Sequence, residues 1–408
     1  MSVGSASRAS LYTVMEIQKL VKSGRSSSGF KRADISGRTA VFNYFESLYS
    51  PEVTANLIFV DAGGSLQADK DQDTQERLGS IKSSLPITGE ERVAIKIESK
   101  SGILDFTKNP LRVDEVPSTT SESNRESIFL SLISDPLLRN LEIKDPTKTY
   151  TGRISDTVKS ILKDLRIKKF DIDPTQNNYN FISRSRGGLD LITDLCRRSI
   201  PVNGDPGYFF YETQDGFNFK SIDALFNQKE KRTLIFTGTP DLPVNYDAKI
   251  IKYSVERNVD VKTNLTLGAY ANQTLFFDFY EYKYTKRDYS VGEGGTSGSK
   301  DKIVTGGKDN FYASADKKLI DTPSRLMTRI LDVGTLPSGR SSEKQLETWK
   351  DKPDQPTFDA EKVMVQSLMR YNQMYAIKIN VLVAGDFTLK AGDLIKCDFS
   401  KVSPSKNS

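Results

Sequence analysis

The spacing of apolar residues predicts strands near both ends of the chain and helices in its middle. Residues 39–60 (TAVFNYFESLYSPEVTANLIFV) hold two runs rich in aromatic and β-branched residues on either side of Ser50-Pro51, which predicts a strand, a turn and a strand. Residues 93–98 alternate between branched apolar side chains and other residues, and this period of two predicts a strand with one buried face. Residues 115–127 (EVPSTTSESNRES) are polar, and we expect them to form a loop.

The middle of the chain has the period of an α-helix. Residues 154–167 place their apolar positions on one stripe, and Ser155 or Asp156 is a suitable N-cap. Residues 187–201 predict a second amphipathic helix that ends at a proline. In residues 207–226 (GYFFYETQDGFNFKSIDALF) aromatic residues alternate around an Asp-Gly pair, which is a strong signal for a β-hairpin. The helices and the hairpin are expected to form one α/β module.

Strand signals return in the last part of the chain. The Gly-rich stretch 291–310 predicts a loop or an insertion, and residues 358–382 predict a helix that runs into a strand. Two short strands are expected within 385–400, on either side of an Ala-Gly-Asp turn. The other expected strands lie at 233–238, 249–261 and 274–284.

Composition narrows the function classes. The chain has 408 residues, enough for several domains, and its 58 basic and 53 acidic residues leave a net charge of only +5. Charge so weak and so mixed in sign does not favour nucleic acid or a membrane surface as the partner. The N-terminal residues lack the apolar core of a signal peptide, and no apolar run approaches the roughly 20 residues of a membrane-spanning helix. We therefore expect neither export by a signal of its own nor insertion into a membrane.

The chain contains no histidine, which excludes the usual serine or cysteine triads and histidine metal ligands. Cys196 and Cys397 lie far apart in sequence, so no disulfide framework or metal-binding spacing is expected, and both suit a reducing cytoplasm. Cys196 lies within an amphipathic helix, where a buried thiol is favoured over a nucleophile.

Paired carboxylates are the remaining candidates for catalysis, because two of them suffice for a glycosidase. Each pair lies in a polar turn or loop, where solvated charge is the favoured interpretation. Two Gly-Gly pairs lack the residue pattern of a phosphate-binding loop. We expect no catalytic, cofactor-binding or metal-binding residues. The pairs considered are Glu90 with Glu91, Asp114 with Glu115, Asp171 with Asp173, Gly187 with Gly188 and Gly294 with Gly295.

Several stretches, in the same order along most of the chain, resemble the baseplate hub proteins of contractile-tailed bacteriophages of the T-even type. They begin with FESLYSPEVTANLIFVDAGG (45–64) and PITGEERVAIKIES (86–99). The helix and aromatic hairpin resemble the family's middle segment, and residues 258–284 its long strand region. None of these stretches is a catalytic motif, so the resemblance rests on their order.

The resemblance implies a mainly β protein with α+β segments, in which two β-barrel domains flank a module of helices and a hairpin. Three chains would close into a ring that joins a trimeric spike to a hexameric tail tube or tube initiator. Wedge proteins and the tape measure protein would be further partners, and DNA would pass through without sequence-specific binding. The protein would be assembled in the host cytoplasm and act in the tail baseplate of the virion.

The resemblance also implies the domain bounds. The first barrel would be 39–114, the mixed module 115–232, and the second barrel region 233–408 with the Gly-rich loop and a helix inserted. Residues 1–38 would be an N-terminal arm or helix. Family members continue past residues 392–399 (GDLIKCDF) with another strand pair, which leaves the closure of the second barrel open.

Aromatic residues are the expected packing or interface residues, since alternating aromatics in a hairpin pack a core or a subunit interface. One group would line the wall or rim of the first barrel, and the other the packing face of the hairpin. The two groups are Tyr44, Phe45, Tyr49 and Pro51, and Phe209, Tyr211, Phe217 and Phe219.

Two alternatives of other classes remain open at this point. A tail-associated cell-wall hydrolase would use a carboxylate pair in a cleft, and a receptor- or carbohydrate-binding tail protein would use exposed aromatic residues. A structural protein without enzymatic activity or cofactor is the favoured interpretation.

Overall fold

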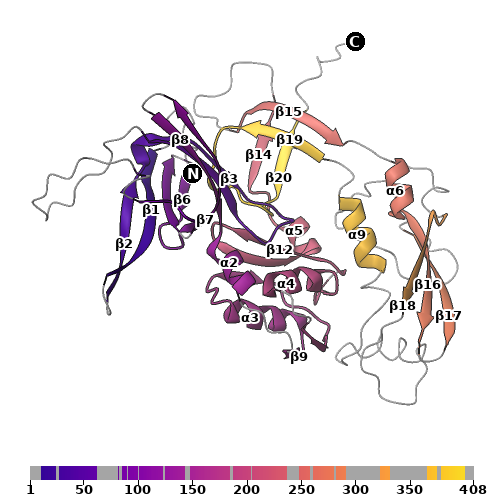
Figure 1. Cartoon of the computed structure of the whole chain (residues 1–408). Helices are drawn as coiled ribbons and strands as arrows, with labels where there is room; N and C mark the ends of the chain where they lie inside the picture. The colour runs from indigo at the N-terminus through magenta and orange to yellow at the C-terminus, as the bar shows by residue number, and fades with distance from the viewer. Residues whose placement is uncertain are drawn as a thin grey trace, which may run out of the picture.

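The computed structural model shows a mainly β protein with several separate sheets (Figure 1). In the part of the chain that the structure describes, none of these sheets closes into a barrel. The described residues are 11–23, 27–61, 81, 85–89, 91–99, 101–122, 125–142, 148–183, 187–203, 205–236, 248–257, 261–279, 282–290, 322–330, 365–374 and 378–399.

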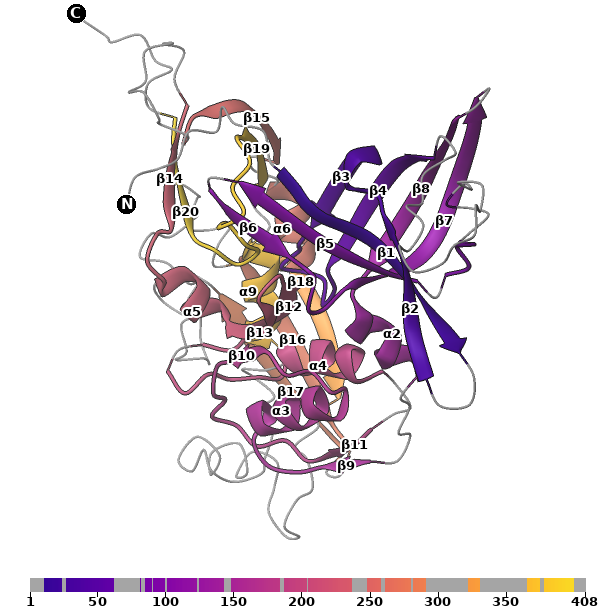
Figure 2. The ribbon, with the colours of Figure 1, turned by 90° about the vertical axis from the view of Figure 1, so that its left-hand side faces the viewer.

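Eight strands form the first sheet, in the order β2-β1-β5-β7-β8-β4-β3, with β6 paired to β5. A short 3-10 helix, η1 (Ser36–Arg38), joins β2 to β3. The sheet lies on one side of the molecule, and β7 and β8 project from it as a long hairpin (Figure 2). The strands are β1 (Leu11–Ser23), β2 (Ser27–Asp34), β3 (Thr39–Phe45), β4 (Thr54–Asp61), β5 (Arg92–Ser99), β6 (Gly102–Asp105), β7 (Leu111–Glu122) and β8 (Arg125–Ile133).

Period-two alternation creates the core of this sheet. Every second residue of β4 is buried, and Val93, Ile95 and Ile97 of β5 are buried in the same cluster. Each such side chain contributes roughly 1.5–3 kcal/mol relative to an exposed position. The strand, turn and strand predicted for 39–60 and the strand predicted for 93–98 are confirmed.

Two expectations for this region are wrong. Residues 11–23 and 27–34 are strands rather than an arm or helix, because Met15 and Ile17 are buried against β5, and a short apolar pattern fits either period. Residues 115–122 and 125–127 are not a loop but belong to the paired ends of β7 and β8. Alternation of apolar and polar residues indicates a strand with one buried face. Residues 114–121 are exposed on both faces, so their sequence shows no such alternation. The first sheet thus extends from residue 11 to residue 133.

The mixed module packs helices against a three-stranded sheet of order β10-β13-β12. The aromatic hairpin is confirmed, since β12 and β13 pair antiparallel around Gln214-Asp215. The apolar stripe of α3 is buried as predicted, but its N-cap is Arg153, while Ser155 and Asp156 lie inside the helix. The elements are α2 (Asp135–Glu142), β9 (Thr149–Tyr150), α3 (Ile154–Asp164), β10 (Phe170–Ile172), β11 (Phe181–Ile182), α4 (Gly188–Cys196), β12 (Tyr208–Thr213), β13 (Gly216–Ser221) and α5 (Ile222–Asn227).

The last part of the chain forms three small sheets, with β14 parallel to β20, β15 antiparallel to β19, and the order β17-β16-β18. The helix followed by a strand is confirmed within 367–383, but only one of the two strands expected at 385–400 is present. The Gly-rich stretch 291–310 lies outside the described residues. The elements are β14 (Arg232–Ile235), β15 (Ile250–Arg257), α6 (Val261–Leu267), β16 (Ala271–Asp278), β17 (Lys283–Ser290), β18 (Arg325–Ile330), α9 (Ser367–Met374), β19 (Lys378–Val383) and β20 (Ile395–Asp398).

Candidate functional site

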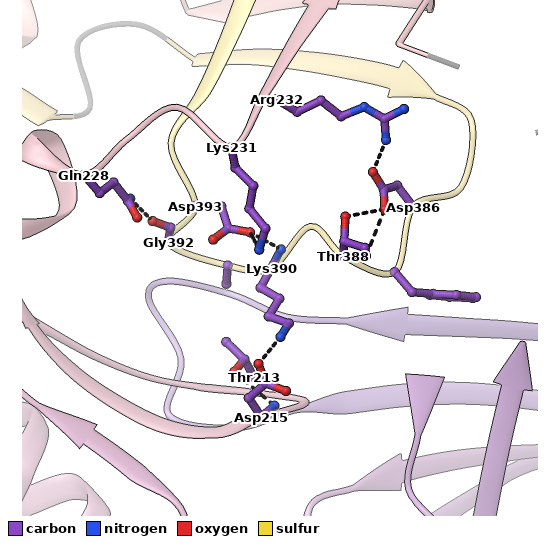
Figure 3. Close-up of polar contacts among 12 residues, drawn as sticks. Thr213, Asp215, Gln228, Lys231, Arg232, Asp386, Thr388, Lys390, Gly392 and Asp393 are labelled. Atoms are coloured by element: carbon purple, nitrogen blue, oxygen red, sulfur yellow. Dashed lines mark hydrogen bonds and ion pairs between the residues drawn. The ribbon is translucent and has the colours of Figure 1, made fainter. Parts of the chain in front are cut away.

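Three distant parts of the chain meet at the tip of the β12–β13 hairpin. They are the hairpin turn, the connection from β3 to β4, and the loop 385–393 between β19 and β20, which we call the C-terminal loop. Figure 3 shows this loop lying over the hairpin turn, with polar side chains between them. Segments far apart in the sequence are therefore in contact at this point, and we call the contact region the hairpin-tip junction.

Glu46 joins all three parts through one carboxylate. Its Oε1 accepts hydrogen bonds from the Tyr44 hydroxyl at 2.6 Å and from the Gln214 backbone N–H at 2.8 Å. Its Oε2 accepts one from the backbone N–H of Ala391, 345 positions away in sequence, at 2.8 Å. Burial and the neighbouring Glu46 carboxylate raise the pKa of Tyr44 above its ordinary value, so the hydroxyl keeps the proton that it donates.

Glu212, near the end of β12, is a second buried carboxyl group of the junction. Its side chain faces the first sheet, where Oε2 accepts a hydrogen bond from the Val53 N–H at 3.0 Å. Burial raises the pKa of Glu212 to about 7, and the carboxylates of Glu52 and Glu46 add to this rise. The hydrogen bond from Val53 opposes the shift without cancelling it.

The C-terminal loop is fixed by ion pairs with two other segments (Figure 3). Asp386 pairs with Arg232 of β14, and the exposed fractions of these side chains are only 4% and 16%. Lys390 pairs with Asp215 in the hairpin turn, and Asp393 with Lys231 at 2.7 Å. Because the Asp386 pair is screened from water, it contributes more to the position of the loop than the two exposed pairs.

Gly392 allows the loop to approach the hairpin. Its φ of +86° lies in the left-handed region, and a Cβ atom there would overlap the Tyr211 hydroxyl. Its carbonyl oxygen accepts a hydrogen bond from Gln228 Nε2 at 2.5 Å. A glycine is required at this position for both conformation and space.

The aromatic residues predicted for the hairpin are all buried, but on two faces rather than one. Phe217 and Phe219 lie in the module core, where Phe219 stacks on Tyr208 with ring centroids 4.5 Å apart. Phe209 and Tyr211 point the other way, toward the hairpin-tip junction. Successive strand residues face opposite sides, so the hairpin joins the module core to the junction.

The residues predicted from the first barrel lie near the same junction. Tyr44 and Pro51 are half-buried, whereas Phe45 and Tyr49 are 49% and 57% exposed. The Tyr49 ring still contacts Phe209 edge-on, with centroids 5.8 Å apart. That these residues form an interface between chains stays a prediction.

The candidate carboxylate pairs take part in structural contacts. Asp171 and Asp173 both pair with Lys220, at 2.8 and 2.9 Å. Glu91 caps a turn by accepting the Thr88 and Gly89 N–H groups, at 2.8 and 2.9 Å, and also pairs with a lysine.

The remaining candidates do not form a site either. Asp114 and Glu115 are exposed on β7, and Glu90 and the pair Gly294-Gly295 lie outside the described residues. Gly187 and Gly188 begin α4, where the next N–H donates to Asn140. The Cys196 thiol is buried in α4, and burial raises its pKa above the ordinary value, which makes it a poor nucleophile.

Sequence patterns did not identify Glu46, Glu212 or the C-terminal loop. A single glutamate next to a strand looks like a solvated charge, and only the fold brings these segments together. The one local signal is Asp386 two positions before Thr388, since Asp386 Oδ1 accepts the Thr388 N–H at 2.9 Å, a typical Asx turn.

No group of three or more histidine, cysteine or acidic side chains suited to a metal ion occurs among the described residues. Nor does any helix in the described part of the chain have the length and apolarity needed to cross a membrane.

Comparison with known proteins yields structural likenesses only. No protein-family model and no curated sequence matches the chain. A tail protein from Neisseria meningitidis MC58 aligns over 90% of this chain and 80% of its own, at 10% identity and a TM-score of 0.47. The 43 kDa tail protein of prophage MuSo2 from Shewanella oneidensis aligns over 94% and 87%, at 10% identity and 0.48. A chain of the Francisella PdpA-VgrG complex aligns over 81% and 42%, at 11% identity and 0.38. TM-scores below 0.5 at these identities assign the chain to no family.

Proposed function

We propose that the chain is a structural protein of a phage tail and, more specifically, a baseplate hub. Three copies would close into a ring that joins a trimeric spike to the hexameric tail tube. The first sheet and the elements from β14 to β20 would be its two barrel regions. Wedge proteins and the tape measure protein would be the other partners, and DNA would pass through the ring without sequence-specific contacts.

The main observation in favour of a structural protein is the role of the acidic side chains at the hairpin-tip junction. Glu46, Glu212 and Asp386 all hold chain segments in place through main-chain N–H groups or a buried arginine. A catalytic pair would instead face a cleft with room for a substrate. Carboxylates used in this way favour a scaffold over an enzyme. The specific assignment to a hub rests on the ordered resemblance in the sequence.

Exposed apolar side chains supply a second observation in favour of assembly. In the β17-β16-β18 sheet, Phe277 lies between Tyr284 and Ile330 in one row across three strands. Tyr284 and Ile330 are 60% and 63% exposed. Contiguous apolar residues on a surface mark contacts with other proteins more often than isolated ones do.

Averaged electron micrographs of the purified chain in negative stain test the proposal. Rings with threefold symmetry are expected, alone or after addition of the neighbouring spike protein. Single compact particles under both conditions would contradict it. Zymography on peptidoglycan gels would then test the hydrolase alternative, and glycan binding the receptor alternative.

A further inference from the structure

A cavity of about 430 Å³ lies beside the first sheet, within the volume range of ligand sites. It is lined by Tyr12 of β1, residues 42–45 of β3, Ile97 of β5, and Asp386 and Phe387 of the C-terminal loop. The cavity adjoins the hairpin-tip junction, because Tyr44 lines the cavity and its hydroxyl donates to Glu46.

Four consecutive residues of β3 line this cavity. Successive side chains of a strand point to opposite faces, so a pocket over one face would contact only every second residue. A cavity lined by residues 42–45 therefore lies along the edge of β3. Among the described residues β3 pairs with β4 alone, so this edge has main-chain N–H and C=O groups without a strand partner.

β1 also borders the cavity, through Tyr12, and its edge away from β5 is only partly paired. At Met15 it is occupied, because the Met15 carbonyl accepts from the Ile35 N–H at 2.8 Å and its N–H donates to Ser36 Oγ at 3.2 Å. Pairing of β1 with β2 begins only at Glu16, so from Leu11 to Val14 β1 is paired with β5 alone within the described part of the chain. The cavity thus lies between two strand edges.

The two ends of the sheet differ in charge. Sheet edges are commonly protected from pairing by charged residues or proline. At one end β2 carries Lys31, Arg32 and Asp34, whereas β3 at the other end (TAVFNYF) carries neither charge nor proline. The unprotected edge is the one that borders the cavity.

From these observations we propose that the cavity binds an extended peptide segment of another protein as an added β-strand between β3 and β1. Only an extended polypeptide offers N–H and C=O groups to both edges at the repeat of a strand. This binding does not depend on the proposed ring, because every residue of the site comes from one chain.

The lining also defines the peptide. The one charged side chain, Asp386, is already paired with Arg232, so the cavity offers no charge for an ionic partner. Tyr12, Phe42 and Phe45 supply aromatic surface. The bound segment therefore has uncharged residues, with apolar side chains at alternate positions to contact these rings.

Selection from a library of random ten-residue peptides on the purified full-length chain tests this proposal. Selected peptides are expected to bind the parent chain and to lose affinity when central backbone amides are N-methylated in either alternate set, because one set faces β3 and the other faces β1. This scan uses the unchanged protein, so it does not depend on how any variant folds.

Two variants locate the binding site. Phe45→Lys and Tyr12→Lys place a charge at the partly exposed edge and are expected to weaken peptide binding by at least about tenfold. Ile182→Lys, on an exposed position of β11 in the mixed module, is the matched control and is expected to leave binding unchanged. Thermal melting of each variant checks that the fold is intact.

Three results would overturn the proposal. One is that no peptide is enriched on the parent chain above the level found with Phe45→Lys. Another is that N-methylation of the central amides leaves the affinity of the selected peptides unchanged. The third is that Phe45→Lys changes only the oligomeric mass while no peptide binds, which would assign the edge to a second copy of this chain. Since ring formation is measured separately, failure here leaves the proposed function untouched.

Discussion

At the scale of single residues, Glu212 makes the stability of the folded protein depend on pH. Its folded pKa of about 7 lies above the ordinary value of 4.5, so the folded protein holds this proton more tightly than the unfolded chain does. The stability from this group is fully present below pH 4.5 and is lost as the pH rises to about 7. Above that pH a buried charge remains, with two other glutamates nearby.

Replacing Glu212 by glutamine is expected to remove this loss, because the amide oxygen can still accept the Val53 N–H but carries no charge. Relative to the parent, the variant gains on the order of 2–3 kcal/mol of unfolding free energy between pH 4.5 and pH 8. Urea unfolding across this pH range measures the difference. Glu115→Gln, at an exposed position of β7, is the control. If the unfolding free energies of the parent and the Glu212 variant changed in parallel with pH, the raised pKa of Glu212 would be wrong.

Gly392 offers a second residue-scale prediction. Gly392→Ala should destabilise the protein by roughly 1–3 kcal/mol, because alanine at positive φ is strained and its methyl group meets Tyr211. Gly385→Ala in the same loop is the matched control, since a Cβ atom there has no neighbour within 4 Å. Combining Gly392→Ala with Tyr211→Phe should recover part of the loss. Equal melting temperatures for the two alanine variants would contradict the described loop conformation.

At the scale of elements, the buried ion pair between Asp386 and Arg232 holds the C-terminal loop on β14. Asp386→Asn should cost roughly 3–5 kcal/mol, because it leaves a buried guanidinium without its counter-charge. Lys390→Gln breaks the pair with Asp215, whose side chain is largely exposed, and should cost less than about 1 kcal/mol. Chemical denaturation of both variants measures the difference, and similar costs would mean that the loop is not held by the buried pair.

The aromatic hairpin yields a further element-scale prediction. Phe217→Ala removes a ring that stacks on Phe210 in the module core, at a centroid distance of 5.5 Å, and should cost roughly 3–5 kcal/mol. Tyr49→Ala, at the exposed side of the junction, should leave the melting temperature close to that of the parent. If Phe217→Ala melted like the parent, the packing role of the hairpin would be wrong.

How far the sequence predicts the fold depends on how local each signal is. The Asp-Gly hairpin, the stripe of 154–167 and the alternation of 93–98 were predicted because turn chemistry and periodicity are encoded within each segment. Residues 115–122 and 125–127 were missed because residues 114–121 are exposed on both faces and show no alternation, and residues 11–23 because pairing of β1 with the distant β5 decides their conformation. Glu46 and Glu212 were missed for the same reason, since their partners are 168 and 159 positions away.

At the scale of the whole molecule, contacts between distant segments dominate. The first sheet, the mixed module and the C-terminal loop are joined through Glu46 and Glu212, whereas the β17-β16-β18 sheet exposes a row of apolar residues. This combination fits a subunit whose distant segments are held together by internal contacts and whose exposed apolar residues become buried on assembly. A ring of three such subunits is the central claim of the proposed function.

The native mass of the purified chain, measured by light scattering with and without the neighbouring spike protein, tests that claim most directly. The proposed ring predicts a particle of three times the 45.6 kDa of one chain when the chain is alone, or, once the spike is added, a complex with the mass of three chains plus that of the bound spike. A chain that keeps the mass of a monomer under both conditions would contradict it.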